Sequence, residues 1–179
     1  MHKNLGDDTH ATSAGTAGTG VTATEYGDGH NRVTKLVLSG VAITIGDNAA
    51  LADGALIYTF PAGALVIESS SISVGLTLTT GTPTTDTPEI GLGTTIASGV
   101  NATLGAVAAT AEDIMAGAST PVMADIAGTA EVFTHVTNLK VEAADAHTVH
   151  INVADTWANV DDTAATLDGT VWIKWAFLA

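Results

Sequence analysis

The stretch ALIYTFPAGALVIESSSISVGLTLTT, from Ala55 to Thr80, shows the clearest geometry in the chain. Successive side chains of a strand point to opposite sides, so Leu56, Tyr58 and Phe60 are expected to share one face. The segment Phe60–Gly63 places proline second and glycine fourth, an arrangement that favours a type I turn. We therefore predict a long antiparallel hairpin, against which the rest of the chain packs.

The second half of this stretch changes its inward face at a run of serines. Leu65 and Ile67 stand at one parity, and the apolar residues after the serines stand at the other: Ile72, Val74, Leu76 and Leu78. A strand buries both sets on one side only if a residue is inserted or if the strand passes between two sheets. Residues 69–71 are therefore predicted to mark a β-bulge or a bend between sheets.

The composition is that of a single domain with a substantial core. Of 179 residues, 46% are hydrophobic but only 4% are aromatic, so the core has to be built from valine, isoleucine, leucine and alanine. Threonine, valine and isoleucine dominate the periodic segments, which is typical of many short strands. We predict an all-β protein: an antiparallel β-sandwich, jelly-roll-like, with about eight strands and one short helix.

Alternating apolar residues predict where the other strands lie. These segments are residues 21–24, 32–45 with a break near Ser39-Gly40, 90–96, 133–141, 149–153 and 171–177. The helix is predicted to begin at Thr110, as its N-cap, and to end at Gly117. Glu112 and Asp113 suit the positive first turn of such a helix.

The first residues differ in character from the rest of the chain. Residues 1–20 are small, polar and glycine-rich, and such a segment cannot bury enough apolar surface to offset its ordering entropy. We predict an extended N-terminal arm at 1–20, flexible or ordered by a partner, followed by a single β-sandwich domain at 21–179. GTAGTG lacks the G-x-G-x-x-G spacing, so no dinucleotide site is expected there.

The charge excludes several classes of partner. Five basic residues against nineteen acidic ones give a net charge of −14, which phosphate backbones and anionic lipids repel. We therefore expect no nucleic acid and no membrane as partners. The chain has no cysteine, no apolar signal core and no long apolar run, and we expect it to be synthesised in a cytoplasm and to stay soluble.

Histidines and acidic clusters are the candidate metal ligands in the sequence. His147 and His150 are three apart on a predicted strand, which places them on opposite faces. Asp161, Asp162 and Asp168 lie in a polar loop predicted over 155–169 and form the best candidate for calcium, with Asp7-Asp8 and Asp28-Asn31 as weaker ones. None matches the twelve-residue calcium loop, so solvated turn residues are the preferred interpretation and no metal or cofactor is expected.

Catalytic signatures are absent from the sequence. There is no G-x-S-x-G elbow and no phosphate-binding loop, and nothing selects a catalytic pair among the carboxylates, so we expect no enzymatic activity. Tyr26, Trp157 and Trp172 are candidates for stacking on sugar rings. Packing or a subunit contact is the preferred interpretation, with Trp157 anchoring the loop at 155–169.

Several segments resemble small acidic virion proteins of tailed bacteriophages. They are GTGVTATEYGDGHNRVTKLVLSG, GDNAALADGALIYTFPAGALVIESSSISVGL, TPEIGLGTTIASG and GTVWIKWAFLA. The similarity extends over nearly everything from Gly18 onward and is carried by structural motifs. It implies a capsid decoration protein, which commonly binds as a homotrimer on the outside of a shell built from the major capsid protein.

The expected location is therefore the capsid surface of a virion, and the expected partners are copies of the chain itself and the major capsid protein. Two alternatives stay open. The first alternative is a head-fibre, tail or glycan-binding appendage of the virion. The second is a hydrolase of glycans or cell walls.

Overall fold

The computed structural model describes residues 15–28, 31–46, 50–78, 86–119, 131–145, 147–157 and 163–178. The strands in chain order are β1 (Thr16–Ala17), β2 (Val21–Asp28), β3 (Asn31–Ile45), β4 (Ala52–Thr59), β5 (Leu65–Leu78), β6 (Glu89–Gly93), β7 (Met115–Ser119), β8 (Glu131–Val141), β9 (Thr148–Ala154) and β10 (Thr163–Phe177). Between β6 and β7 lie a one-turn helix, α1 (Leu104–Val107), and a 3-10 turn, η1 (Ala109–Ala111).

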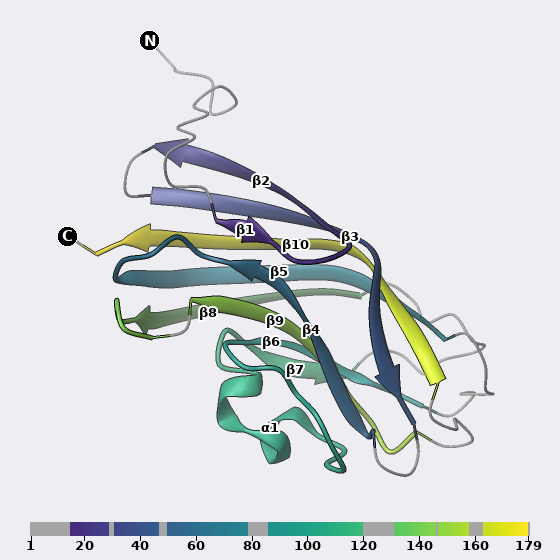
Figure 1. Cartoon of the computed structure of the whole chain (residues 1–179). Helices are drawn as coiled ribbons and strands as arrows, with labels where there is room; N and C mark the ends of the chain where they lie inside the picture. The colour runs from purple at the N-terminus through teal and green to yellow at the C-terminus, as the bar shows by residue number, and fades with distance from the viewer. Residues whose placement is uncertain are drawn as a thin grey trace.

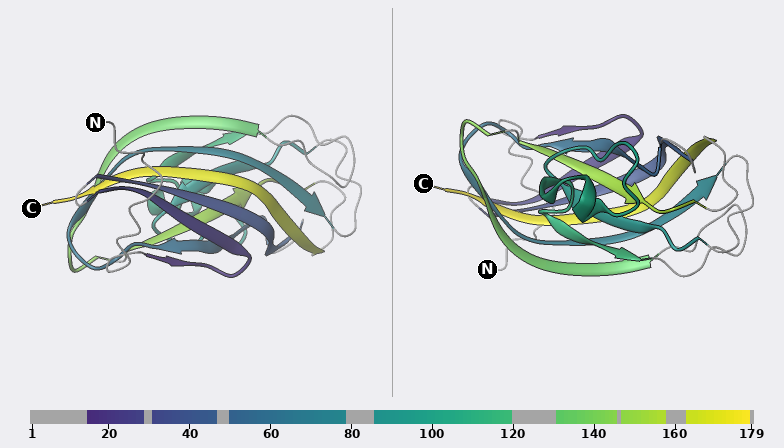
Figure 2. Two further views of the ribbon diagram at one scale, coloured as in Figure 1. Left: turned by 90° about the horizontal axis from the view of Figure 1, so that it is seen from above. Right: turned by 90° about the horizontal axis from the view of Figure 1, so that it is seen from below.

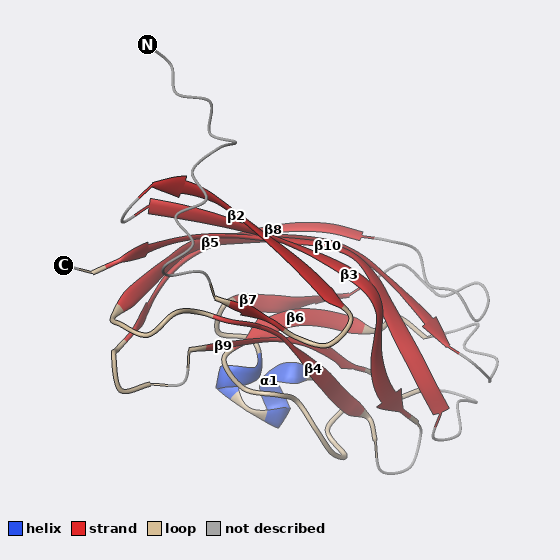
Figure 3. Cartoon of the chain, turned by 45° about the horizontal axis from the view of Figure 1, so that its top comes forward, coloured by secondary structure: helices blue, strands red, loops and turns tan. Residues whose placement is uncertain are grey.

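Two antiparallel sheets of five strands face each other across one core (Figure 1). Sheet I has the order β1-β4-β9-β6-β7, and sheet II has the order β2-β3-β10-β5-β8. Strands make up most of the described chain, and α1 stands apart from them on the outer side of sheet I (Figure 3). Both sheets curve along their strands when the molecule is seen from above and from below (Figure 2).

Strands β3 to β10 form a jelly roll. The chain is arranged like a rolled antiparallel ribbon, in which β3 pairs with β10, β4 with β9, β5 with β8 and β6 with β7. Rolling brings β10 beside β5 and β9 beside β6, which completes the two sheets. Strands β1 and β2 extend the edges at β4 and β3. The predicted jelly-roll-like sandwich is confirmed.

The predicted hairpin over Ala55–Thr80 is wrong in its pairing. Strand β4 belongs to sheet I and β5 to sheet II, so residues 60–64 cross from one sheet to the other. Hydrogen bonds to the start of β9 and the end of β10 hold this crossing. The N–H of Phe60 donates to the carbonyl of His147, and the N–H of Leu178 donates to the carbonyl of Ala64. Alternation shows which side of a strand is buried, but it does not show which strand lies beside it.

Leu56 does not share a face with Tyr58 and Phe60. Its side chain is 40% exposed, whereas those of Tyr58 and Phe60 are buried. The register with β9 shifts between Leu56 and Tyr58, so Ile57 is the extra residue of a bulge and is itself buried. The inserted residue places Leu56 and Tyr58 on opposite sides of the strand. A prediction that assumes regular alternation along the strand misses such an insertion.

Two predicted interruptions of strands are bulges. The inward face of β5 changes between Ile67 and Ser70, where the pairing with β8 also shifts, so the bulge begins one residue before the predicted serine run. In β3 the predicted break near Ser39-Gly40 is a second bulge, and both residues are exposed. Gly40 has a φ of +62°, which a residue without a Cβ adopts at no steric cost. Both strands continue through their bulges within sheet II.

The predicted helix at 110–117 is also wrong. The helical turns lie earlier, and Gly117 belongs to β7. Glu112 and Asp113 do not serve a helix N-terminus: the Glu112 carboxylate accepts the N–H of Gly117, and that of Asp113 accepts the N–H and hydroxyl of Thr94. The loop predicted over 155–169 is shorter than expected, because β10 begins at Thr163.

The core contains a row of aromatic rings in contact. The ring of Phe60 lies edge-on to those of Tyr58 and Trp175, at 5.2 and 5.1 Å, and Trp175 contacts Phe177 at 5.1 Å. The predicted alternation at the C-terminal strand is confirmed, because Ile173 and Trp175 are buried while Trp172 is exposed. Trp157 is buried and donates its indole N–H to the carbonyl of Leu51.

The end of the predicted arm is part of the sandwich. Thr16 and Ala17 pair with Thr59 and Tyr58 at the edge of sheet I. Residues 1–14 lie outside the described residues. The division of the chain at residue 20 stays a prediction.

Candidate functional site

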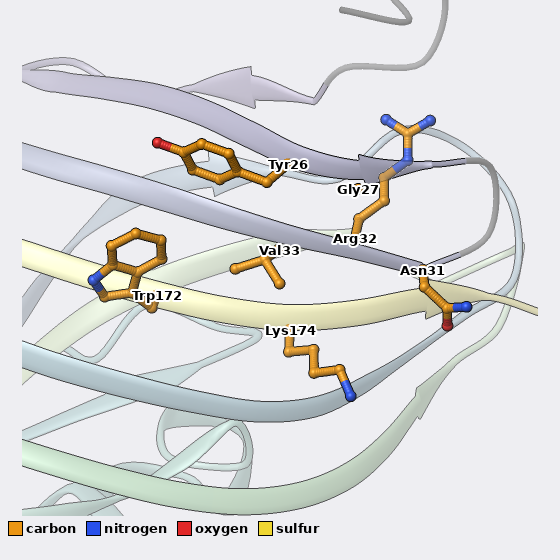
Figure 4. A pocket seen from close by; sticks show the side chains of 7 residues that line it. All are labelled: Tyr26, Gly27, Asn31, Arg32, Val33, Trp172 and Lys174. Carbon is orange, nitrogen blue, oxygen red and sulfur yellow. The ribbon is translucent and has the colours of Figure 1, made fainter. Parts of the chain in front are cut away.

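A groove on the outer side of sheet II, over β2, β3 and β10, is the most site-like feature of the described surface (Figure 4). It has a volume of about 570 Å³ and is open to solvent. We call it the outer groove; its lining residues are Tyr26, Gly27, Asn31, Arg32, Val33, Trp172 and Lys174.

Strand register brings the aromatic side chains of the groove together. Tyr26 lies opposite Val33, and Val33 lies opposite Lys174, so three adjacent strands contribute to one surface. The rings of Tyr26 and Trp172 are stacked, with centroids 6.1 Å apart and planes 25° apart. Trp172 is 38% exposed and Val37, farther along β3, is 39% exposed. Large rings left open to water on a rigid sheet are typical of an interaction surface.

Two lysines accompany the aromatic rings. The ammonium of Lys35 lies 5.2 Å from the centre of the Trp172 ring, a distance at which the cation is attracted to the ring face. Lys174 pairs with Glu68 at 2.6 Å, and its side chain is 55% exposed. The groove therefore offers apolar area and positive charge side by side.

Arg32 lines the groove but directs its charge inward. Its guanidinium donates to the Glu25 carboxylate at 2.9 Å and lies 5.7 Å from the ring of Trp175. The hydroxyl of Tyr58 donates to the same carboxylate. The N–H of Gly15 also donates to Glu25, at 2.9 Å, so this cluster attaches the start of β1 to the sandwich.

The Glu25 cluster is structural in character. Burial, and secondly the adjacent Glu25 carboxylate, raise the pKa of the Tyr58 hydroxyl far above its ordinary value. A phenol held neutral in this way donates its hydrogen bond at every physiological pH, which suits a structural contact.

The two candidate metal-binding histidines lie in different surroundings. His147 precedes β9, and its Nε2 is 2.8 Å from the carbonyl oxygen of Gly63 in the crossing between sheets. His150 is half-buried beside Gly93 and Thr94, and burial lowers the pKa of its imidazole. Within the described ranges, no group of three or more His, Asp or Glu side chains is arranged to hold a metal ion.

The acidic candidates are only partly described. Outside the described residues lie Asp7, Asp8, Asp161, Asp162 and the side chain of Asp28. Asp168 is exposed, and its Oδ1 accepts the N–H of Gly40 at 2.8 Å, so it caps the bulge of β3.

Other described carboxylates bind backbone amides in the same way. Asp53 accepts from Thr44, Asp155 accepts from Thr87, and Glu89 accepts from Leu104 at the start of α1. These acids close loops and bulges, which is a structural use of their charge.

The three aromatic candidates for stacking on sugars do not lie together. Trp157 belongs to the core, whereas Tyr26 and Trp172 meet in the outer groove. Lys35 and Val37 were missed as members of this surface. Their parity along β3 was visible in the sequence, but the adjacency of β3 and β10 was not.

Asn152 was also missed. It is fully buried, it donates to the carbonyls of Thr95 and Ala111, and its Oδ1 accepts the N–H of Ala97. One amide thus holds the loop over the outer side of sheet I. The alternation of apolar residues over 149–153 placed Asn152 on the outer side of the strand, and the sequence carried no signal that a loop covers it there.

In the part of the chain that the structure describes, no helix is long and apolar enough to cross a membrane.

No protein-family model and no curated protein matches the chain. Among solved structures, the chain is similar to one described as "Cyanophage Pam1 capsid asymmetric unit", with 16% sequence identity and a TM-score of 0.43. The match covers 96% of this chain and 99% of that chain. At this identity and TM-score, the similarity assigns neither a fold nor a function.

Proposed function

We propose that the protein is a structural virion protein that binds the outside of a phage capsid as a homotrimer and stabilises the shell. The observation that carries this proposal is the exposed aromatic and cationic surface around Trp172 on a stiff jelly roll. A side chain of this kind, left open on an isolated subunit, becomes buried when the subunit joins an assembly. The resemblance of the segments from Gly18 onward to small acidic virion proteins of tailed bacteriophages, which implies a decoration protein, supports the same function.

Stabilisation of a shell follows from mass action. A protein that binds the closed shell and not the opened one shifts the equilibrium toward the closed form. Many identical contacts on one particle add their effects, so no single contact has to be strong. The location implied is the outer surface of the capsid, with the major capsid protein as partner.

The proposal includes no catalytic activity. In its support, carboxylates such as Asp53, Asp168 and Glu25 are engaged with backbone amides or basic side chains. A general acid or base must instead be directed at a substrate.

A second candidate is a glycan-binding appendage of the virion, present at a vertex or on the tail. The observation in its favour is the pair of stacked rings, Tyr26 and Trp172, in an open groove. Sugar rings stack their apolar faces on such aromatic side chains.

Sedimentation with purified shells tests the proposal. Shells assembled from the major capsid protein of the same phage are mixed with the protein, pelleted, and analysed for stoichiometry. Decoration predicts saturation at many copies per shell in multiples of three. Absence of the protein from the pellet contradicts the proposal, and a few copies per particle together with binding to a glycan array favours the appendage.

A further inference from the structure

We infer that the outer groove receives the acidic end of a neighbouring copy of the same chain, so that copies associate head to tail. The inference rests on the self-association in the proposed function and adds the surfaces that make it. It concerns contacts between copies and leaves the contact with the shell to other surfaces.

The first step is the distribution of positive charge. The chain has five basic residues, and the four that the structure describes lie toward one end of the sandwich: Arg32, Lys35, Lys140 and Lys174. In the pairing of β3 with β10, Lys174 lies opposite Val33 and Arg32 lies opposite Trp175, and Lys140 pairs with Val66 near the start of β5. Lys174 lines the outer groove, and Lys35 holds its ammonium over the ring of Trp172, which also lines it.

The second step is a set of carboxylates on the other half of the same strands, with Asp168 at the mid-strand bulge and Asp53 and Asp155 toward the far end. Asp53 bonds to Thr44 near the end of β3, Asp168 bonds to Gly40 at its bulge, and Asp155 follows the end of β9. We call these three carboxylates the acidic end. Each has hydrogen bonds to backbone amides that hold it in place without neutralising its charge.

The third step is geometry. Lys35 and Thr44 are nine residues apart on one strand, which is about 30 Å of extended chain. Complementary surfaces of this kind are compatible with a two-fold dimer as well as with a closed ring, and the homotrimer of the proposed function requires the ring. In the ring they form a heterologous interface, in which each copy uses its groove on one neighbour and its acidic end on another, and three such contacts close a cyclic trimer.

The chemistry of the contact is charge with an aromatic anchor. A carboxylate entering the groove meets Lys35 directly and Lys174, which already pairs with Glu68. Trp172 supplies the apolar area that excludes water from the contact. In a chain of net charge −14, copies repel one another, and of the four described cations only Lys35 forms no ion pair with a described carboxylate. Association through this groove is therefore expected to weaken as salt is added.

Sedimentation equilibrium of the full chain in solution, without shells, measures the association. The wild type is expected at three times 17.9 kDa. Lys35→Glu and Trp172→Ala are each expected to weaken trimer formation at least about tenfold. Lys140→Glu is the matched control, because Lys140 is exposed at the same end, pairs with Glu142 and lies on β8 outside the groove. It makes the same change in net charge and is expected to leave the trimer intact.

The acidic end is tested with Asp53→Asn combined with Asp168→Asn. Asparagine keeps an oxygen for the N–H of Thr44 and Gly40 while removing the charge, so the fold is retained, and circular dichroism verifies this. This variant is also expected to be monomeric. A head-to-tail contact makes a further prediction for a mixture of the two variants. The Asp53→Asn, Asp168→Asn variant keeps its groove and the Lys35→Glu variant keeps its acidic end, so one interface forms between them and gives a complex of twice 17.9 kDa.

Each outcome decides for or against the inference. If the variants Lys35→Glu and Trp172→Ala both remain trimeric, the inference is overturned and the proposed function stays in place. A monomeric wild type that still pellets with shells would overturn it, and the dependence of pelleting on Trp172 would then assign the groove to the shell. If Lys140→Glu loses association to the same extent as Lys35→Glu, net charge alone governs association and the inference is overturned. A monomer that also fails to bind shells contradicts the proposed function separately.

Discussion

Trp175 is the side chain on which the packing of the core depends most directly. It is fully buried, contacts Phe60 and Phe177 edge-on, and donates its indole N–H to Thr34 at 2.9 Å. We predict that Trp175→Ala lowers the free energy of unfolding by about 3–5 kcal/mol, measured by urea denaturation. Trp172→Ala, three residues away on the exposed side, is the control, and equal losses in the two variants would contradict the assignment of faces.

His150 is predicted to make stability depend on pH. Burial lowers the pKa of its imidazole in the folded protein, so the unfolded chain takes up a proton at a higher pH than the folded protein does. The free energy of unfolding should therefore fall as pH decreases through the ordinary histidine pKa, about 6.5, toward the lower folded value.

Thermal unfolding of His150→Gln, compared with the wild type between about pH 7.5 and 5.5, checks this dependence. The variant is expected to lose part of the slope, and His147→Gln serves as the control. An unchanged slope in His150→Gln would show that another group is responsible.

At the scale of an element, one buried amide, that of Asn152, makes three of the hydrogen bonds that hold the loop from Thr94 to Ala111. Asn152→Ala leaves the N–H of Ala97 and the carbonyls of Thr95 and Ala111 without their partner. We predict a loss of at least about 2 kcal/mol in unfolding free energy and faster proteolysis within the loop. Asn101→Ala removes an exposed bond to Ala106 and is the control. Equal proteolysis of both variants would contradict this role for Asn152.

The N-terminal arm is predicted to act mainly in attachment. Removal of residues 1–14 should leave the thermal midpoint unchanged and weaken binding to shells. Removal of residues 1–20 should also lower the midpoint, because it takes away the pairing of β1 with β4 and the contact of Gly15 with Glu25. Circular dichroism and shell pelleting measure the two effects. Unaltered pelleting in both deletions would assign attachment to the sandwich alone.

The whole molecule is predicted to stabilise shells in proportion to its binding. At a free concentration one hundred times the dissociation constant, each site contributes about 2.7 kcal/mol toward the closed shell. The temperature at which shells open should therefore rise with added protein and reach a plateau at saturation. Light scattering during heating measures the opening. A temperature that does not change while the protein is bound would separate attachment from stabilisation.

Local pattern was sufficient to predict most of the strands and the inward side of many of them. The alternation at 171–177, the change of face in β5 and the break in β3 all appear in the structure. Each is a property of neighbouring residues, since the period of two is set by the strand itself. The same period places Trp172 and Trp175 on opposite sides of β10, as the structure shows.

The arrangement of the strands in space depends on contacts between distant residues. The chain on either side of Pro61 alternates as a hairpin would, yet burying both apolar sides requires β4 and β5 to lie in opposite sheets. The outer groove exists because β10 is inserted between β3 and β5, which brings Trp172 to Tyr26 across β3. Residues about 140 positions apart become neighbours only when the ribbon is rolled up, because rolling covers the apolar face of each sheet with that of the other.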